Sequence, residues 1–162
     1  MRKILTSLLI VAILATSVVC CVACQKGETP ESPSAFDSLK ALSAAGTIEF
    51  GSKNSKYGTF LTSVTYDGVT IDNDAANGKY IGVFINTDDE KLIDVYGMCD
   101  SITYGEETFN YSGVGIDAIP YTEGLKVLIA FTVDVGNWHY APVSGSALLF
   151  TLPETVEKIT LN

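Results

Sequence analysis

The sequence predicts a strand-rich α+β domain in which a sheet packs on one helix. Two observations carry this prediction. Apolar residues recur at helical spacing in residues 35–45, whereas from residue 57 onward they alternate with polar residues, as in strands. The chain has 162 residues, 47% of them hydrophobic and 18% charged, which is enough apolar material for one core of ordinary size.

The first residues have the pattern of a secretory signal. Met1-Arg2-Lys3 is positively charged and residues 4–19 are almost entirely apolar, which matches the n-region and h-region of such a signal. We therefore expect a signal peptide over residues 1–23 and export of the folded part. The alternative is an uncleaved transmembrane anchor, because residues 4–23 are about long enough to span a bilayer.

The junction after the apolar run resembles the lipobox of bacterial lipoproteins. Lipoprotein signal peptidase needs a small residue before an acylated cysteine, and Ala23-Cys24 fits that requirement. The resemblance implies a lipid on Cys24 that holds the protein at the extracellular face of the cell membrane. Residues 24–33 are polar and contain two prolines, so we expect a flexible tether there and a folded domain over residues 34–162.

One helix is predicted at the start of this domain. Phe36, Leu39 and Leu42 share one helical face. Ser34 followed by Asp37 three residues later is typical of a capping box, and Gly46 is a suitable left-handed stop.

Two strands follow, joined by a polar loop. In residues 57–66 the alternation predicts that Phe60, Val64 and Tyr66 lie on the buried face. Residues 80–86 are apolar on both faces, which is typical of a strand at the centre of its sheet.

The remaining strands lie on either side of an acidic insertion at about residues 87–112. This insertion contains two short apolar runs and is either a strand pair or a projecting loop. Residues 125–135 show the clearest alternation in the chain. Residues 147–152 and 156–161 are expected to form an extra C-terminal strand pair.

Several short motifs occur in a characteristic order: Tyr57-Gly58-x-Phe60-x-x-Ser63-Val64, Gly78-Lys79-Tyr80-x-x-x-Phe84-Ile85-Asn86, Gly113-Val114, and Glu123-Gly124 before a strand ending in Phe131-Thr132. This order resembles the transcobalamin carboxy-terminal-like domain found in many bacterial surface lipoproteins. The resemblance covers roughly residues 35–134. It implies a β-grasp fold of the soluble-ligand-binding kind, a mixed sheet wrapped on one helix.

In animal cobalamin carriers this domain closes over the corrinoid from one side. The resemblance therefore implies a non-catalytic binding module that captures a small solute, such as a corrinoid, for uptake. The alternative is an adhesion or interaction domain that binds a surface protein or glycan. No cofactor is expected apart from such a cobalamin-type ligand.

The net charge and the reactive residue types disfavour several kinds of partner and site. The net charge of −9 disfavours nucleic acid as a partner. His139 is the only histidine, which excludes a multi-histidine metal site within one chain, and no Gly-x-Ser-x-Gly motif accompanies it.

Cys99 is expected to be buried and inert. Asp72-Asn73-Asp74 indicates a solvated turn or, as the alternative, a weak calcium site, so we expect neither catalysis nor an assigned metal site.

Aromatic residues are the richest resource for binding, with eight tyrosines and one tryptophan. Amphipathic rings near turns bind sugars, corrinoids or peptides at little entropic cost. The alternative is that they cap the ends of a β core. The candidate ligand-binding residues are Tyr57, Tyr80, Tyr111, Trp138, His139 and Tyr140.

Overall fold

The computed structural model describes residues 33–153 and 155–162. The predicted signal peptide, Cys24 and all but the last residue of the predicted tether lie outside this part of the chain. That last residue, Pro33, already belongs to the domain, because its carbonyl accepts a hydrogen bond from Tyr121 N at 2.7 Å. No helix within the described residues is long and apolar enough to cross a membrane.

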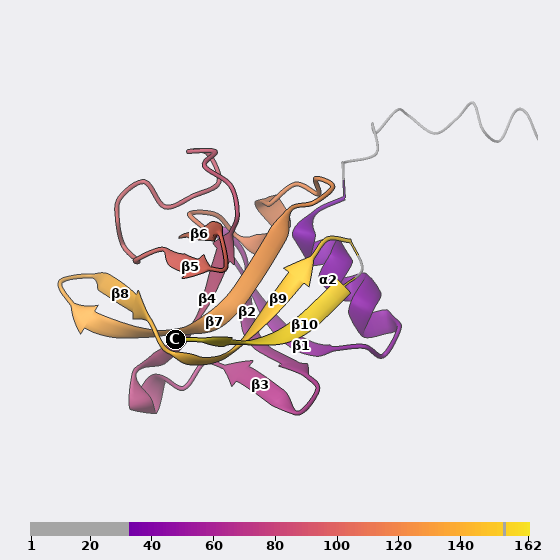
Figure 1. Cartoon of the computed structure of the whole chain (residues 1–162), viewed down its shortest axis with the longest axis horizontal. Helices are drawn as coiled ribbons and strands as arrows, with labels where there is room; N and C mark the ends of the chain where they lie inside the picture. Colours follow the sequence, from indigo (N-terminus) through magenta and orange to yellow (C-terminus); the bar gives the residue numbers. More distant parts are fainter. Residues whose placement is uncertain (1–32, 154) are drawn as a thin grey trace, which may run out of the picture. The chain divides into compact units, whose positions relative to one another are not determined.

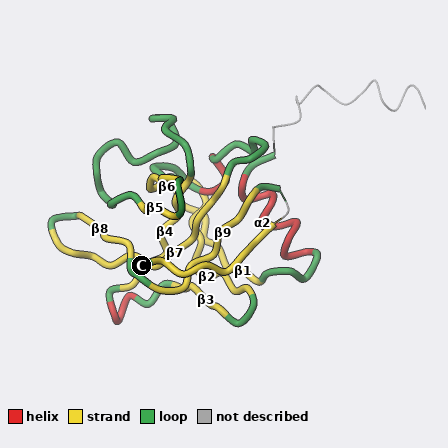
Figure 2. The backbone as a smooth tube through the Cα atoms, viewed as in Figure 1, coloured by secondary structure: helices red, strands yellow, loops and turns green. Residues whose placement is uncertain are grey.

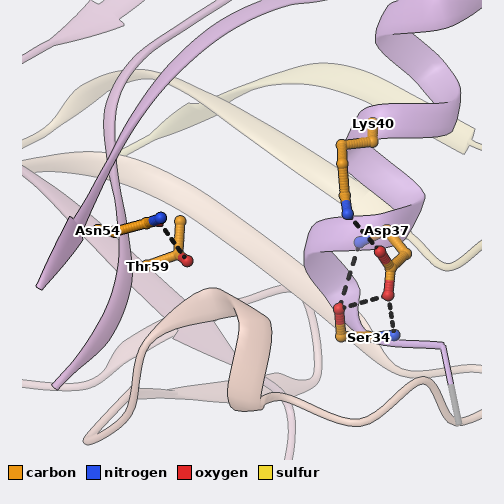
Figure 3. Close-up of polar contacts among 5 residues, drawn as sticks. All are labelled: Ser34, Asp37, Lys40, Asn54 and Thr59. Carbon is orange, nitrogen blue, oxygen red and sulfur yellow. Dashed lines mark hydrogen bonds and ion pairs between the residues drawn. The ribbon is translucent and has the colours of Figure 1, made fainter. Parts of the chain in front are cut away.

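The predicted helix and its cap are confirmed. Helix α2 spans Ala35–Ala44, and Ser34 is its N-cap. Asp37 Oδ2 accepts hydrogen bonds from Ser34 N at 2.9 Å and Ser34 Oγ at 2.8 Å, and Lys40 Nζ lies 2.6 Å from Asp37 Oδ1 (Figure 3). Gly46 follows the helix with φ of 75°, a conformation that glycine adopts without steric cost.

A three-stranded antiparallel sheet follows the helix. It consists of β1 (Glu49–Ser55), β2 (Gly58–Tyr66) and β3 (Val69–Asp72), paired in chain order. Thr59 Oγ1 donates to Asn54 Oδ1 at 3.0 Å across the first hairpin (Figure 3). The sequence pattern did not predict β1, because most of its side chains are polar and exposed.

The prediction that Phe60 lies on the buried face of its strand is wrong. Gly51 pairs with Ser63 and Ser52 pairs with Leu61, which leaves Thr62 as an extra residue on β2. This bulge reverses the faces that point inward. Leu61 is buried before the bulge and Val64 after it, while Phe60 is 47% exposed.

The second sheet has seven strands in the order β10-β9-β7-β4-β6-β5, with β8 paired to β7. The strands are β4 (Lys79–Ile85), β5 (Ile102–Tyr104), β6 (Glu107–Tyr111), β7 (Lys126–Gly136), β8 (His139–Pro142), β9 (Gly145–Thr151) and β10 (Thr155–Leu161), and two short 3-10 helices, η1 (Ala75–Asn77) and η2 (Ile116–Ala118), lie in the connections. Among the described strands every pairing is antiparallel, so the expected mixed sheet is not found. The connections explain this, because none contains a crossover helix between parallel strands.

The second sheet is apolar on both faces and separates two hydrophobic clusters. On one face Ile85, Ile129 and Phe150 pack with residues of α2 and the three-stranded sheet. On the other face Phe84, Leu128 and Leu149 pack with residues of the β5–β6 hairpin. The predicted central position of β4 is therefore confirmed: it lies between β7 and β6 and is buried on both faces at its end.

The predicted insertion forms two parts. Residues 86–101 form a loop between β4 and β5, and the rest forms the β5–β6 hairpin, which covers the second cluster. Figure 2 shows this loop in green on the same side of the domain as β8, and Figure 1 shows the β7–β8 hairpin extending away from α2. The loop and the hairpin together form the candidate site.

Candidate binding surface

The β7–β8 hairpin ends in a two-residue turn with an unusual occupant. Gly136 pairs with His139, and the two residues between them, Asn137 and Trp138, have φ of 55° and 61°. Positive φ at both central positions is the geometry of a type I′ turn, in which the second position favours glycine. Asp134 Oδ1 accepts a hydrogen bond from Gly136 N at 2.7 Å and supports the turn. Trp138 is 89% exposed at its tip.

The loop between β4 and β5 docks on this hairpin. Its residues 94–98 are held by Asp94, whose carboxylate accepts hydrogen bonds from Tyr96 N and Met98 N. Tyr140 N then donates to Met98 O at 2.7 Å, and Asp100 N donates to Tyr140 O at 3.3 Å. These two bonds place Cys99 opposite Tyr140 in an isolated parallel bridge.

His139 joins the same two segments through its side chain. Its Nδ1 lies 2.9 Å from Gly97 O, and its Nε2 lies 3.1 Å from Asp100 Oδ1. The Gly97 carbonyl and then the Asp100 carboxylate raise the pKa of His139 above its ordinary value of 6.5. While Nε2 faces the Asp100 carboxylate, Nδ1 faces the backbone carbonyl of Gly97. In a catalytic dyad this nitrogen would face the hydroxyl or thiol that it activates.

Exposed apolar side chains gather on these two segments. The described residues include seven large hydrophobic side chains that are exposed, and five of them lie on the loop or at the end of the hairpin. We call these five residues the aromatic tip: Val95, Tyr96, Met98, Val135 and Trp138. Residues 94–100 and 134–140 contain three aspartates, Asp94, Asp100 and Asp134, and neither lysine nor arginine.

Three of the predicted ligand-binding residues lie beneath the tip. Tyr80 and Tyr140 pack edge to face, with ring centroids 5.7 Å apart. Tyr111 packs in the same way on Phe84 at 5.4 Å, and burial raises its pKa to about 12. Their rings therefore contribute mainly to packing.

Tyr57 lies apart from the aromatic tip. It is 70% exposed at the turn between β1 and β2, with Lys56 Nζ 4.7 Å from its ring centroid. The structure therefore brings Trp138 and His139 together above Tyr80 and Tyr140, whereas Tyr57 belongs to another surface.

The sequence pattern missed the half of the tip that the loop supplies. Val95, Tyr96 and Met98 fall in the insertion, whose position relative to the β7–β8 turn cannot be derived from periodicity. A signal was present in Tyr96-Gly97, an aromatic residue beside a turn-forming glycine with φ of 69°.

Cys99 is buried as predicted, and Asp74 of the predicted acidic turn caps a 3-10 helix. Cys99 is buried, and desolvation raises the pKa of its thiol to about 12, so the thiol is protonated near neutral pH. Within residues 33–153 and 155–162 no group of three or more His, Cys, Asp or Glu side chains is arranged to hold a metal ion. Asp74, part of the predicted acidic turn, caps η1 by accepting from Asn77 N at 3.3 Å, and its other oxygen accepts from Asn77 Nδ2 at 2.6 Å.

A polar groove lies next to the docked loop. It has a volume of about 310 Å³ and is lined by Asp100, Thr103, Pro142, Ser144 and Asn162, among others. A smaller cavity of about 40 Å³ lies under Phe60, between β2 and β4, and has room for only a few water molecules. The groove is at the lower end of the size range of small-molecule sites.

Comparison with known proteins does not assign the chain to a family. No family model, curated protein or solved structure matches it. The resemblance to the transcobalamin carboxy-terminal-like domain therefore stays a prediction.

Proposed function

We propose that the protein is a non-catalytic binding module, anchored at the extracellular face of the membrane by a lipid on Cys24, and that its aromatic tip binds a protein partner. One observation carries the proposal: Trp138 is 89% exposed in a turn where its φ is 61°. A residue other than glycine in this conformation costs about 1 kcal/mol. Neither burial of the ring nor turn geometry explains a tryptophan there, whereas contact with a partner does.

The composition of the tip favours a protein over a glycan. Val95, Met98 and Val135 are aliphatic or thioether side chains, which match the apolar surface of a protein better than the hydroxyl groups of a sugar. Tryptophan, tyrosine and methionine are enriched at protein interfaces. The presence of Asp94, Asp100 and Asp134 on the two segments, without lysine or arginine, suits a partner with basic residues near its own apolar site.

We also propose that the domain is β-grasp-like and related to the transcobalamin carboxy-terminal-like family. The packing of one helix and a curled sheet around the first cluster supports this proposal. A second candidate function, capture of a corrinoid-like solute, comes from this resemblance, and the polar groove of about 310 Å³ beside the loop is the feature that favours it.

Site-specific photocrosslinking on intact cells tests the proposed function. A photoreactive phenylalanine analogue replaces Tyr96, which is 87% exposed in the tip, and in a matched control it replaces Tyr57, which is 70% exposed elsewhere. We expect one discrete protein adduct from position 96, none from position 57, and loss of the adduct in a Trp138→Ala background. Equal adducts from both positions, or none from position 96, would contradict the proposal.

A titration of the same protein with cobalamin and cobinamide distinguishes capture of a corrinoid-like solute from binding of a protein partner. A shift in the visible absorbance of the corrinoid, together with the absence of a protein adduct, would favour solute capture. Binding to a glycan panel without any protein adduct would favour a glycan partner.

A further inference from the structure

Both nitrogens of the His139 ring face oxygen atoms that can only accept hydrogen bonds. Nδ1 lies 2.9 Å from the carbonyl oxygen of Gly97, and Nε2 lies 3.1 Å from a carboxylate oxygen of Asp100. Neutral imidazole carries one N–H, so it can make only one of these bonds and must turn a lone pair toward the other oxygen. The doubly protonated, cationic ring makes both bonds. Only the imidazolium satisfies both oxygen atoms at once.

The charges around His139 favour the same protonation state. The hydrogen bonds to Gly97 and Asp100 make the largest contributions to the raised pKa of His139. The negative charges of Asp100 and Asp94, both on the docked loop, raise it further. On β7, Asp134 Oδ1 accepts a hydrogen bond from the backbone N–H of Gly136, the residue that pairs with His139. Cys99 adds no charge near neutral pH, since the pKa of its thiol is raised to about 12.

We propose that protonated His139 clamps the loop to the β7–β8 hairpin, in addition to the backbone hydrogen bonds of Tyr140, and that loss of this proton weakens the docking of the loop. The proposal rests on the proposed function, because the clamp holds the segment that carries Tyr96 and Met98 against the hairpin that carries Trp138. The pKa of His139 is higher in the clamped state, so the clamp is complete below the ordinary value of 6.5 and weakens as the pH rises through the raised value. Partner binding is therefore stronger at mildly acidic pH than at alkaline pH.

The buried thiol of Cys99 reports the state of the clamp without any partner. Cys99 lies between the two loop residues that His139 contacts, Gly97 and Asp100, and is 9% exposed. Transient opening of the loop, which is more frequent when its docking is weakened, exposes the thiol to an alkylating reagent. Alkylation of Cys99 in the full chain, measured by peptide mass spectrometry, distinguishes it from the other cysteines.

The test compares alkylation rates of His139→Ala and the wild type at each pH, because the ratio of the two rates cancels the titration of the thiol itself. We expect the alkylation rate of His139→Ala to exceed that of the wild type by roughly threefold to tenfold at pH 5.5, where two solvent-exposed, charge-assisted hydrogen bonds are lost. We expect a smaller ratio at pH 8.5, because the neutral ring makes only one of these bonds. Asp100→Asn should give an intermediate ratio at pH 5.5 and lower the pKa of His139, which NMR measures as the only histidine of the chain. Asp88→Asn removes the same charge from the same loop away from the clamp and should behave as the wild type.

A ratio of one at pH 5.5 for both clamp variants would overturn the clamp. So would a His139 pKa at or below 6.5 in the wild type. If the clamp is found but position 96 gives no partner adduct, only the proposed function fails. If the adduct is found but its yield is the same at pH 5.5 and 8.5, the clamp does not regulate binding.

Discussion

Asp117 Oδ1 accepts a hydrogen bond from the backbone N–H of Thr59 at 2.7 Å, across 58 positions of the chain. This bond ties the start of β2 to η2, and it lowers the pKa of Asp117 below the ordinary value of 3.8. It also explains why glycine stands at positions 58 and 115. A Cβ on Gly58 would lie 2.9 Å from Asp117 Oδ1, and one on Gly115 would lie 2.7 Å from Thr59 N, so both backbones need glycine to approach each other.

Replacing Asp117 should destabilise the domain in a pH-dependent way. Asp117→Ala removes the acceptor from Thr59 N, and we expect a loss of about 1 kcal/mol in the free energy of unfolding at pH 7. Because the folded state lowers the pKa of Asp117, its contribution is present above pH 3.8 and is lost as the pH falls through the lowered value. Urea unfolding from pH 7 to pH 2.5 measures this. An equal loss at every pH would contradict an ionic origin.

Gly115→Ala should destabilise the domain more than Gly51→Ala. At Gly115 the new methyl group would meet the backbone atoms Thr59 N at 2.7 Å and Gly58 Cα at 2.8 Å, which can move only together with both segments. Such overpacking costs about 1–3 kcal/mol. At Gly51 the two closest atoms are the side-chain oxygens of Thr62 and Ser63, which can rotate away, so we expect a change below about 1 kcal/mol. Equal urea midpoints for the two variants would show that the contact at Gly115 is not tight.

The helix cap should also contribute stability that acid removes. Ser34→Ala deletes the hydroxyl that both caps Asp37 N and donates to Asp37 Oδ2, and we expect a loss of about 1 kcal/mol in the free energy of unfolding.

Hydrogen bonds with Lys40 and then Ser34 lower the pKa of Asp37 from 3.8 to about 2, so the contribution of its carboxylate is complete above pH 3.8 and disappears toward pH 2. Thermal unfolding of Asp37→Asn should therefore differ from the wild type at pH 6 and approach it near pH 2. A difference that persists at pH 2 would exclude the charge as its cause.

Elements with a strong apolar pattern could be predicted from the sequence. The helix after Ser34 has apolar residues at helical spacing, strand β4 is apolar on both faces, and strand β7 has alternating apolar residues, although the structure buries both of its faces from Val127 to Ala130. Strand β1 could not be predicted, because its polar residues are held by pairing with β2 rather than by burial. The inward orientation of Phe60 was predicted wrongly, because one unpaired residue, Thr62, reverses the alternation without any mark in composition.

The candidate site was predictable only on the hairpin. Trp138 and His139 follow a strand break at Gly136-Asn137, which is a turn signal in the sequence. Tyr96 and Asp100 reach them through loop docking, which depends on two backbone hydrogen bonds between Tyr140 and the loop. No periodicity encodes that contact, so the partner segment of His139 became visible only in the structure.

The membrane anchor can be tested at the predicted lipidation site. Cys24→Ala should abolish incorporation of a labelled fatty acid, whereas Cys20→Ala, the matched control in the same apolar junction, should keep it. Label retained in Cys24→Ala would move the site to Cys20 or Cys21. A wild-type protein that fractionates with membranes, carries no label and still has residues 4–23 would indicate the uncleaved transmembrane anchor.

Trp138→Gly should make the domain more stable and remove its binding. Trp138 has φ of 61° at a turn position where glycine is favoured, and its ring is 89% exposed, so the substitution relieves backbone strain at little cost in packing. We expect a gain of about 0.5–1 kcal/mol in the free energy of unfolding, reduced by the extra freedom of glycine in the unfolded chain. The photocrosslinked adduct at position 96 should disappear in the same variant. Val133→Gly, a control that removes an apolar side chain from the body of β7, should instead lower stability. A loss of stability in Trp138→Gly would mean that the tryptophan contributes to folding, and the argument that it serves a partner would fail.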